Sequence, residues 1–363
     1  VNFTPNSSRQ LVQSTIRVNV VDGRLSVTNA SGAINNKIGF IRIAPAGATP
    51  TPAPTPITSN WPISWRSAAT PSVARFESYA FSHGGKTYVL GGWEDGFTGS
   101  ERNEVFNPAT NTWRRLRDIP IPQTHAGFAL DERNGVAYAV AGYRGDLPSA
   151  LTNEFWKYTI STDTWSRMPI NAPIKGGAGA AVVMNNKLYH FGGVKDGPDT
   201  NTGNHYVLDL SRVSDGWKQL ATLPTGRDHL SGVALNGYLY AIGGELGHDR
   251  LHAQQKLVHR YNPATNTWAR MADLPTAKSH AESSVFVLNG KIVMAGGQVD
   301  PQSATREVVQ YDPARNAWSR LMSLPAARQG VVVLPAGRYI VVTTGSAYGT
   351  FQEQKTTWVG VLS

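Results

Sequence analysis

Residues 231–268, SGVALNGYLYAIGGELGHDRLHAQQKLVHRYNPATNTW, contain the pattern that decides the fold. Two apolar stretches flank Asn236-Gly237, a dipeptide typical of a tight β-hairpin turn. The second stretch ends in the glycine pair Gly243-Gly244, a loop follows, and a third apolar stretch precedes Trp268. Short alternating stretches separated by such turns predict four antiparallel strands within about 50 residues.

The same pattern recurs along most of the chain. A tryptophan returns at intervals of 50 to 52 residues, and a glycine pair, or a small residue followed by glycine, precedes it. An aromatic residue stands seven positions before most of these tryptophans. The glycine pairs lie at 91–92, 141–142, 192–193, 243–244, 296–297 and 344–345, and the tryptophans are Trp113, Trp165, Trp217, Trp268 and Trp318.

This repeat resembles the kelch repeat, and the resemblance implies an all-β, six-bladed kelch β-propeller. Trp65 has the spacing of a repeat tryptophan but lies before the first complete unit, and the last unit ends after its third strand. We therefore expect the segment from Asn60 to Arg66, near Trp65, to supply the outer strand of the last blade. That strand would join the two ends of the ring and cover an otherwise open sheet edge.

Composition divides the chain into three predicted parts. Residues 60–363 form the propeller, and residues 44–59 are a Pro/Thr-rich linker that cannot form a helix or a sheet ladder. Residues 1–43 contain three short alternating stretches and are predicted to be a β-strand appendage. Its sequence VNVVDGRLSVTNASGAINNKIGFIRIAP, residues 18–45, resembles the closing strands of malectin-like domains. Because those domains occur in extracellular proteins, the resemblance implies a secreted protein.

The overall composition excludes several classes of function. The 363 residues contain no cysteine, which excludes disulfides, thiolate metal sites and cysteine nucleophiles. Lys and Arg exceed Asp and Glu by 34 to 25, but the charge is diffuse and no basic and aromatic residues interleave, so nucleic acid is not an expected partner. No apolar stretch approaches the ~18 residues that a membrane span needs.

Loops between blades carry the first set of candidate binding residues. Several follow a Leu/Ile-Pro-x-x-basic rule, and in kelch propellers basic residues at this position surround the central channel. Such a ring would attract an acidic ligand, whereas the alternative is that the same cations pair with neighbouring acids and hold the blades together. The candidates are Arg75, Glu77, His125, Arg227, His229, Lys278, His280, Glu282 and Arg328.

A second set of candidates clusters in the loop after the fourth glycine pair. Imidazole and carboxylate groups together are suitable ligands for zinc, iron or manganese when no thiolate is present. The predicted metal ligands are Glu245, His248, Asp249 and His252. Their spacing is similar to the iron-binding E-x3-D-x3-H of kelch nitrile-specifier proteins, although it is one residue shorter. The alternative is that these side chains form hydrogen bonds that order the loop.

Three functional hypotheses follow from these residues, and one of them is a metal-dependent activity at the His/carboxylate cluster of the fourth blade. The other two concern the loops between blades. The first is an extracellular, non-catalytic binding module that recognises a carbohydrate or an acidic partner, either a small molecule or a protein. The second is a sugar-acid mutarotase or epimerase similar to bacterial N-acetylneuraminate mutarotases. There, Arg75, Arg227 and Arg328 would orient a carboxylate, while acid/base side chains would move protons. Copper radical oxidases such as galactose oxidase share the kelch propeller, but they need a cysteine, and this chain has none.

Overall fold

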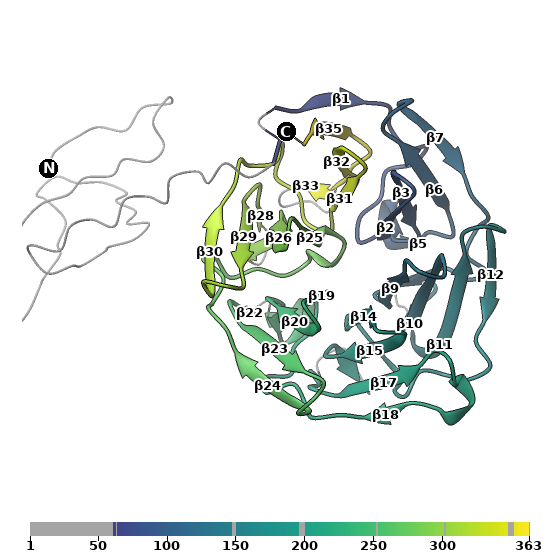
Figure 1. Cartoon of the computed structure of the whole chain (residues 1–363). Coiled ribbons are helices and arrows are strands. Elements are labelled where there is room, and N and C mark those ends of the chain that lie inside the picture. Colours follow the sequence, from purple (N-terminus) through teal and green to yellow (C-terminus); the bar gives the residue numbers. More distant parts are fainter. Residues whose placement is uncertain are drawn as a thin grey trace, which may run out of the picture. The chain divides into compact units, whose positions relative to one another are not determined.

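The computed structural model describes residues 61–62, 64–146, 150–195, 200–251, 253–300, 303–347 and 352–362, with the side chains of residues 249, 250 and 300 left out of the description. The predicted appendage at 1–43 and the linker at 44–59 lie outside these ranges, so both stay predictions. The described chain is almost entirely β-structure arranged as a ring of sheets (Figure 1). None of its helices is long and apolar enough to cross a membrane.

Five sheets of the ring are separate four-stranded antiparallel blades. Their strands, in spatial order, are β2 (Tyr79–His83), β3 (Lys86–Leu90), β6 (Asn103–Asn107) and β7 (Thr112–Arg115); β14 (Ala180–Met184), β15 (Lys187–Phe191), β17 (His205–Asp209) and β18 (Lys218–Gln219); β19 (Ser231–Leu235), β20 (Tyr238–Ile242), β23 (Val258–Asn262) and β24 (Thr267–Arg270); β25 (Val285–Leu288), β26 (Lys291–Ala295), β29 (Val308–Asp312) and β30 (Ala317–Arg320); and β31 (Val332–Ala336), β32 (Tyr339–Thr343), β35 (Thr357–Val361) and β1 (Arg66–Ala68).

The remaining repeat unit belongs to a larger sheet. Strands β9 (Gly127–Asp131), β10 (Val136–Arg144), β11 (Ala150–Thr159) and β12 (Thr164–Arg167) pair in the same order, but β10 and β11 extend past the Ala141-Gly142 position. The extensions pair with β8 (Gln123–Thr124) and β13 (Gly176–Gly177), and β13 pairs with β16 (Val194–Lys195), which gives seven strands. The prediction of six separate blades is therefore wrong. The structure has five, and the β9–β12 unit lies between β2 and β14 in the ring.

The ring closes as the position of Trp65 predicts. Strand β1 pairs antiparallel with β35, with Arg66 opposite Val359 and Ala68 opposite Thr357. The N-terminal side of the described chain thus supplies the outer strand of the sheet that ends it (Figure 1). The predicted strand is confirmed, although it begins at Arg66 and so lies slightly later than expected.

Aromatic pairs fill the space between sheets. The predicted seven-residue spacing places each aromatic residue directly opposite a tryptophan on the next strand, with ring centroids 5.0 to 5.2 Å apart. The pairs are Phe106 with Trp113, Tyr158 with Trp165, Tyr261 with Trp268 and Tyr311 with Trp318. Each inner aromatic ring is essentially fully buried in the core between two sheets, which fixes the sheets around a common centre.

Candidate functional site

A ring of six backbone positions surrounds the centre of the propeller, one just before the innermost strand of each repeat unit. All six residues have a positive φ, between 44° and 57°. Four amide groups donate a hydrogen bond of 2.7 to 3.0 Å to the ring carbonyl of the preceding unit, as Ala178 does to His125 and His229 to Ala178. The six, here called the central ring, are Glu77, His125, Ala178, His229, His280 and Gly330.

The glycine pairs explain why this ring forms. A Cβ atom on Gly244 would lie 2.6 Å from the carbonyl oxygen of Asp228, the residue just before ring residue His229. For the second glycine of the other five pairs, the corresponding distance is 2.4 to 3.0 Å. The absence of a side chain therefore lets the backbone before each innermost strand lie directly on the glycine pair. This contact sets the position of the ring residue.

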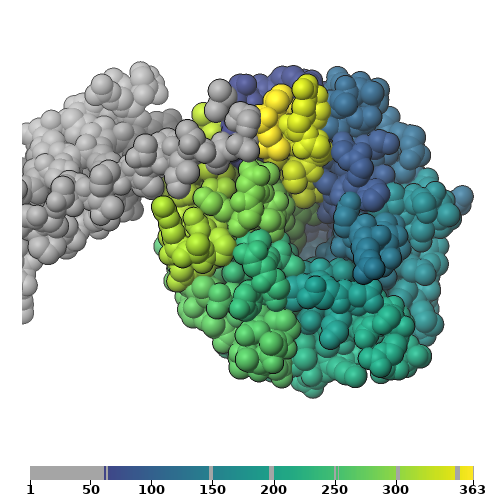
Figure 2. All heavy atoms as spheres, in the orientation of Figure 1, coloured from purple at the N-terminus to yellow at the C-terminus, as the bar shows by residue number. Residues whose placement is uncertain are grey.

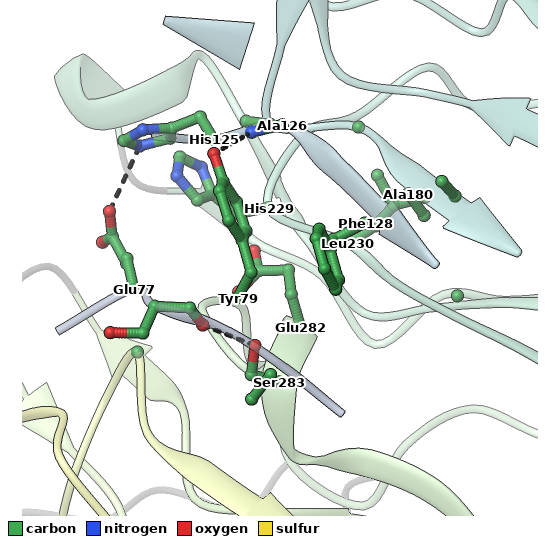
Figure 3. Close-up of a pocket in the computed structure, with 17 residues that line it drawn as sticks. Glu77, Tyr79, His125, Ala126, Phe128, Ala180, His229, Leu230, Glu282 and Ser283 are labelled. Atoms are coloured by element: carbon green, nitrogen blue, oxygen red, sulfur yellow. Dashed lines mark hydrogen bonds and ion pairs between the residues drawn. The ribbon is translucent and has the colours of Figure 1, made fainter. Parts of the chain in front are cut away.

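Five of the six central-ring residues, all except His280, line a pocket at the centre of the propeller, which we call the central pocket. Its empty volume is about 680 Å³, including its open part. The polar lining residues Glu77, His125 and His229 point toward one another, and Tyr79 and Phe128 supply part of an apolar wall (Figure 3). The space-filling view shows a hollow at the centre of the ring of sheets (Figure 2). Ala178 and Gly330 contribute almost no side chain and so leave room.

Glu77 lies between two histidines of the central ring. Its Oε2 atom is 3.2 Å from Nε2 of His125, and its Oε1 atom is 3.6 Å from Nε2 of His280. The His280 ring stacks on that of His229, with centroids 3.9 Å apart, and its Nδ1 atom is 2.6 Å from the hydroxyl of Ser279. Glu77 and His125 therefore form a carboxylate–imidazole pair within reach of proton transfer in the pocket, and His280 lies beside this pair.

A second group of polar side chains adjoins the central pocket and shares His229. The Nδ1 atom of His229 is 2.6 Å from Oδ1 of Asp228 and 3.7 Å from Oε1 of Glu245. The Nδ1 atom of His248 is 3.1 Å from the same Asp228 oxygen. All four side chains are buried. We call Asp228, His229, Glu245 and His248 the buried quartet.

The repeat architecture brings the quartet together. Asp228 and Glu245 exchange two backbone hydrogen bonds, 3.1 and 2.8 Å long, because Glu245 directly follows the glycine pair and Asp228 directly precedes the ring residue. Strand β21 (Glu245–Leu246) and the single helical turn α1 (His248–Leu251) then return His248 toward Asp228. His248 itself has a positive φ of 45°, and Gly247 before it has one of 81°.

Burial and hydrogen bonding act on Asp228 in opposite directions. Burial would raise the pKa of its carboxyl group, but hydrogen bonds from His229 and His248 outweigh this effect and leave the pKa well below the ordinary value. Asp228 is therefore an ionised carboxylate inside the protein. Its charge is stabilised by the two imidazole groups and by the amide of Asn201, which donates to its Oδ2 atom.

The predicted basic residues do not line the central pocket. Arg227 is fully buried, and its guanidinium donates to the carbonyls of Gly243 (2.5 Å), Ala241 (3.1 Å) and Thr225 (2.9 Å). Arg75 is also fully buried and donates to Glu104 at 2.7 Å. Burial lowers the pKa of Arg227 to about 9 and that of Arg75 to about 10. Both cations stabilise the backbone around the glycine pairs.

Lys278 and Arg328 occupy the same repeat position as Arg75 and Arg227, and both are also buried. The Nζ atom of Lys278 lies 3.0 Å from Glu307, and Arg328 donates to the carbonyl of Ala327 at 2.8 Å. Burial lowers the pKa of both groups. The structure thus places none of these four cations in the lining of the central pocket, and their contacts fit the alternative that they hold the blades together. Their side chains are directed into the sheets because they lie two residues before the central ring.

His125 does not occupy the repeat position of the basic residues, where it was predicted to lie. The residue in register with Arg75 and Arg227 is Gln123, whose amide donates to the carbonyl of Ala141, the first residue of its small-Gly pair. His125 is instead a central-ring residue, with Glu77, His229 and His280. Glu282 also lines the central pocket, as the first residue of the 3-10 turn η3 (Glu282–Ser284).

Two of the four predicted metal ligands belong to the buried quartet. Glu245 and His248 face His229 and Asp228. The side chain of Asp249 and the whole of His252 lie outside the described part of the chain, so their roles stay predictions. Asp228 and Asn201 are not among the predicted site residues. Asp228 could be found from its repeat position, because it pairs with Glu245, the residue that directly follows the glycine pair. No sequence pattern indicates Asn201.

Comparisons with known proteins agree with this repeat architecture. The family model described as KLHDC2/KLHL20/DRC7 Kelch-repeats domain matches residues 127–345, more than half of the chain, and the Kelch motif matches residues 80–120. The chain belongs to the kelch-repeat family. The family assignment confirms the expected kelch resemblance, while the malectin-like similarity of residues 18–45 stays a prediction.

The curated relatives of this kelch chain are distant in sequence. A kelch repeat-containing protein of Arabidopsis thaliana is 23% identical over 311 residues, which cover 81% of this chain and 70% of the relative. Kelch repeat and BTB domain-containing protein 1 of vaccinia virus is 27% identical over 59% of this chain, and Kelch-like protein 15 of Mus musculus is 26% identical over 58%. The matches span only 36% of the viral and mouse proteins.

Proposed function

We propose that this kelch propeller is a non-catalytic binding module that holds a partner protein at its central pocket. One observation carries the proposal: the central ring joins neighbouring units by backbone hydrogen bonds and presents Glu77, His125 and His229 to one hollow. Such a pocket is formed before binding, because its polar groups are held by rigid sheets. The chain also belongs to a family in which kelch repeats are combined with other domains, such as a BTB domain, and this supports an interaction role.

The lining favours a partner group that donates hydrogen bonds. Of the described residues that line the central pocket, none is Lys or Arg, whereas Glu77 and Glu282 are carboxylates. An acidic ligand would be repelled by these two groups, so the geometry disfavours the acidic partner expected from the sequence. A lysine side chain of a partner protein fits better, and the hydroxyl groups of a carbohydrate are the second ligand class that the lining suits.

Biolayer interferometry with the full chain tests this proposal. Lysine-rich, neutral and glutamate-rich peptides of equal length are compared, and a glycan array is run in parallel. We expect the lysine-rich peptide to bind most tightly and Glu77→Gln to weaken binding at least tenfold. The matched control is Glu132→Gln, which removes an exposed carboxylate from a β-turn. Equal binding of all peptides, or equal effects of the two substitutions, would refute the proposal. Binding of a glycan without binding of any peptide would refute a protein partner and indicate a carbohydrate ligand.

A second candidate function rests on the carboxylate–imidazole contacts. Glu77 and His125, 3.2 Å apart in the central pocket, form an acid/base pair of the kind that a sugar-acid mutarotase or epimerase needs. Against this stands the position of Arg75, Arg227 and Arg328, which are directed into the sheets and cannot orient a substrate carboxylate in the pocket. Time-resolved NMR of anomeric sialic acid, with and without protein, decides the matter, because equal rates exclude the activity.

We further propose an extracellular location. The Pro/Thr-rich composition of residues 44–59 and the malectin-like similarity of residues 18–45 support it. Fractionation of the source cells with an antibody against the propeller is the test. Recovery of the protein in the cytoplasmic fraction would exclude secretion.

A further inference from the structure

We infer that the buried quartet binds one divalent transition-metal ion through Asp228, His229, Glu245 and His248. Each side chain offers one donor atom, and the four donor atoms lie within 4.8 Å of one another. A bound ion would displace the protons through which the Nδ1 atoms of His229 and His248 donate to Asp228. This site differs from the one that sequence spacing predicts, because Asp228 and His229 come from the loop before β19 and not from the loop that carries Glu245. The inference concerns a metal ion and stands independently of the proposed protein partner.

The distances inside the quartet suit a four-coordinate ion. Bonds of about 2.0–2.2 Å to nitrogen and oxygen in a tetrahedral site place neighbouring donors about 3.3–3.6 Å apart. The corresponding separations here are 2.6 Å and 3.1 Å from Asp228 Oδ1 to the Nδ1 atoms of His229 and His248, and 3.7 Å from His229 Nδ1 to Glu245 Oε1. The separation of 2.6 Å is shorter than the tetrahedral value, so Asp228 and His229 would move apart by roughly 0.7 Å to admit an ion among the four donors.

The outer atoms of the same side chains are held by other residues. Glu245 uses Oε2 to accept hydrogen bonds from Gln254 (2.9 Å) and Ser279 (3.3 Å), which leaves Oε1 directed at His229. Asp228 likewise accepts from Asn201 at Oδ2 while Oδ1 faces both histidines. Partners that orient ligands from outside in this way are typical of metal sites.

Other residues also orient His248 and the loop that carries it. The Nε2 atom of His248 lies 3.3 Å from the hydroxyl of Tyr143, so the opposite ring nitrogen, Nδ1, points into the quartet. Asn201, which holds Asp228, also accepts a hydrogen bond of 2.7 Å from the amide of Gly247. One side chain thus fixes both the carboxylate and the loop that carries His248.

The donor set favours zinc, iron(II) or manganese over calcium or magnesium. Two imidazole nitrogens and two carboxylate oxygens match the borderline metals, whereas the hard cations prefer oxygen ligands alone. A second group, Glu77 with His229 and His280, also lies within 4.8 Å, but it shares His229 with the quartet and offers only three donors. We assign the ion to the quartet because it offers four donor atoms and all four of its side chains are buried.

Metal titration of the full chain tests the inference. Protein stripped with chelator is titrated with Zn²⁺ by calorimetry, and bound zinc is measured by elemental analysis after gel filtration. We expect one zinc per chain, and at least tenfold weaker binding in Glu245→Gln and His248→Ala. The control is His83→Ala, which removes a histidine that pairs with Glu132 outside the quartet and should bind zinc as the wild type does. Glu77→Gln removes a donor of the three-donor group only, so retained zinc in this variant assigns the ion to the quartet.

The outcomes separate the quartet from the alternatives. Failure of the stripped wild-type protein to bind zinc overturns the inference, as does unchanged affinity in His248→Ala. Loss of zinc in Glu77→Gln with retention in Glu245→Gln would move the site to the three-donor group and also overturns it. Because a variant might simply fail to fold, Co²⁺ replaces Zn²⁺ in the wild-type protein as a second measurement. Intense visible absorption of the four-coordinate ion is expected, and the weak spectrum of hydrated Co²⁺ would contradict a quartet site.

Discussion

The indole nitrogen of Trp65 donates a hydrogen bond of 3.2 Å to the carbonyl of Ser323, which lies 258 residues further along the chain. Four of the five repeat tryptophans, all except Trp165, make the same bond to a carbonyl 44 to 47 residues earlier, as Trp113 does to Ala69 and Trp268 to Ala221. Trp65 therefore occupies the repeat position across the joint of the ring. This joint depends on that bond, on core packing, and on the pairing of β1 with β35.

Substitution Trp65→Ala should open the joint. Trp65 packs on the core that includes Trp61, whose ring lies 5.9 Å away edge-on, and it loses both this contact and the hydrogen bond. We expect the free energy of unfolding to fall by about 2–4 kcal/mol, measured by urea denaturation. Amide exchange in β35 should accelerate more than in β20. As a control, Met322→Ala alters a side chain that is 51% exposed and should change stability by less than about 0.5 kcal/mol. An equal loss in the two variants would contradict the role of Trp65.

Substitution Gly244→Ala should disrupt the contact that forms the central ring. Its φ of 97° is unfavourable for alanine, and a Cβ would lie 2.6 Å from the Asp228 carbonyl and 2.9 Å from Leu230. We expect a loss of about 3 kcal/mol or more in thermal or urea unfolding, because strain and a backbone clash add. Gly237→Ala is the matched control. Its φ is 79°, but nothing lies within 4 Å, so only about 1 kcal/mol of backbone strain is expected. Similar losses at both glycines would show that the close approach is unimportant.

Most of the fold could be predicted because it depends on short-range, repeated signals. The spacing of Trp113 to Trp318 and the glycine pairs determines the repeat length, and the extra tryptophan at 65 indicates how the ring closes. The seven-stranded sheet could not be predicted, since it requires β10 and β11 to continue past Ala141-Gly142. Whether strands continue there depends on pairing with β8 and β13, which are distant in sequence.

The candidate site was predicted only in part, for a physical reason. Residues two positions apart in the loop before each innermost strand face different surroundings. Arg227 is buried against carbonyls, while His229 faces the central pocket. The sequence shows both residue types but not which of them points inward. The left-handed backbone at His229 decides this, and its neighbours Asp228 and Leu230 lie against Gly244, which is 15 residues further along the chain. The glycine pair is visible in the sequence, but the residues that pack on it are not.

Substitution Arg227→Lys distinguishes a structural cation from a ligand-binding one. The guanidinium donates to the carbonyls of Gly243, Ala241 and Thr225, and a single ammonium group cannot reach all of them. We expect a loss of about 2–4 kcal/mol in the free energy of unfolding, with unchanged affinity for any ligand of the central pocket. Arg212→Lys, at a side chain that is 65% exposed, should be neutral. If Arg227→Lys instead weakened ligand binding and left the free energy of unfolding unchanged, Arg227 would be a ligand-binding residue.

Two buried histidines should make stability depend on pH. Burial lowers the pKa of His190 to about 4, and burial lowers that of His205 to about 4 as well. The ordinary pKa of about 6.5 applies to the unfolded chain, which therefore binds more protons than the folded chain between pH 6.5 and 4. The contribution of the two histidines to the free energy of unfolding is fully present above pH 6.5 and is lost as the pH decreases toward 4. Each histidine contributes about 3 kcal/mol to this decrease.

Substitution His190→Val should flatten this pH dependence. The equivalent positions in the other repeat units hold only apolar residues, including Val89, Ala241 and Met294, so valine suits the site. We expect the loss of stability between pH 7 and 4.5, measured by urea denaturation, to shrink by roughly half of the part caused by the two histidines. Met294→Val changes packing at the equivalent position without removing a titratable group, and its pH profile should run parallel to that of the wild type. A His190→Val profile that also runs parallel to the wild type would show that His190 is not neutral in the folded protein.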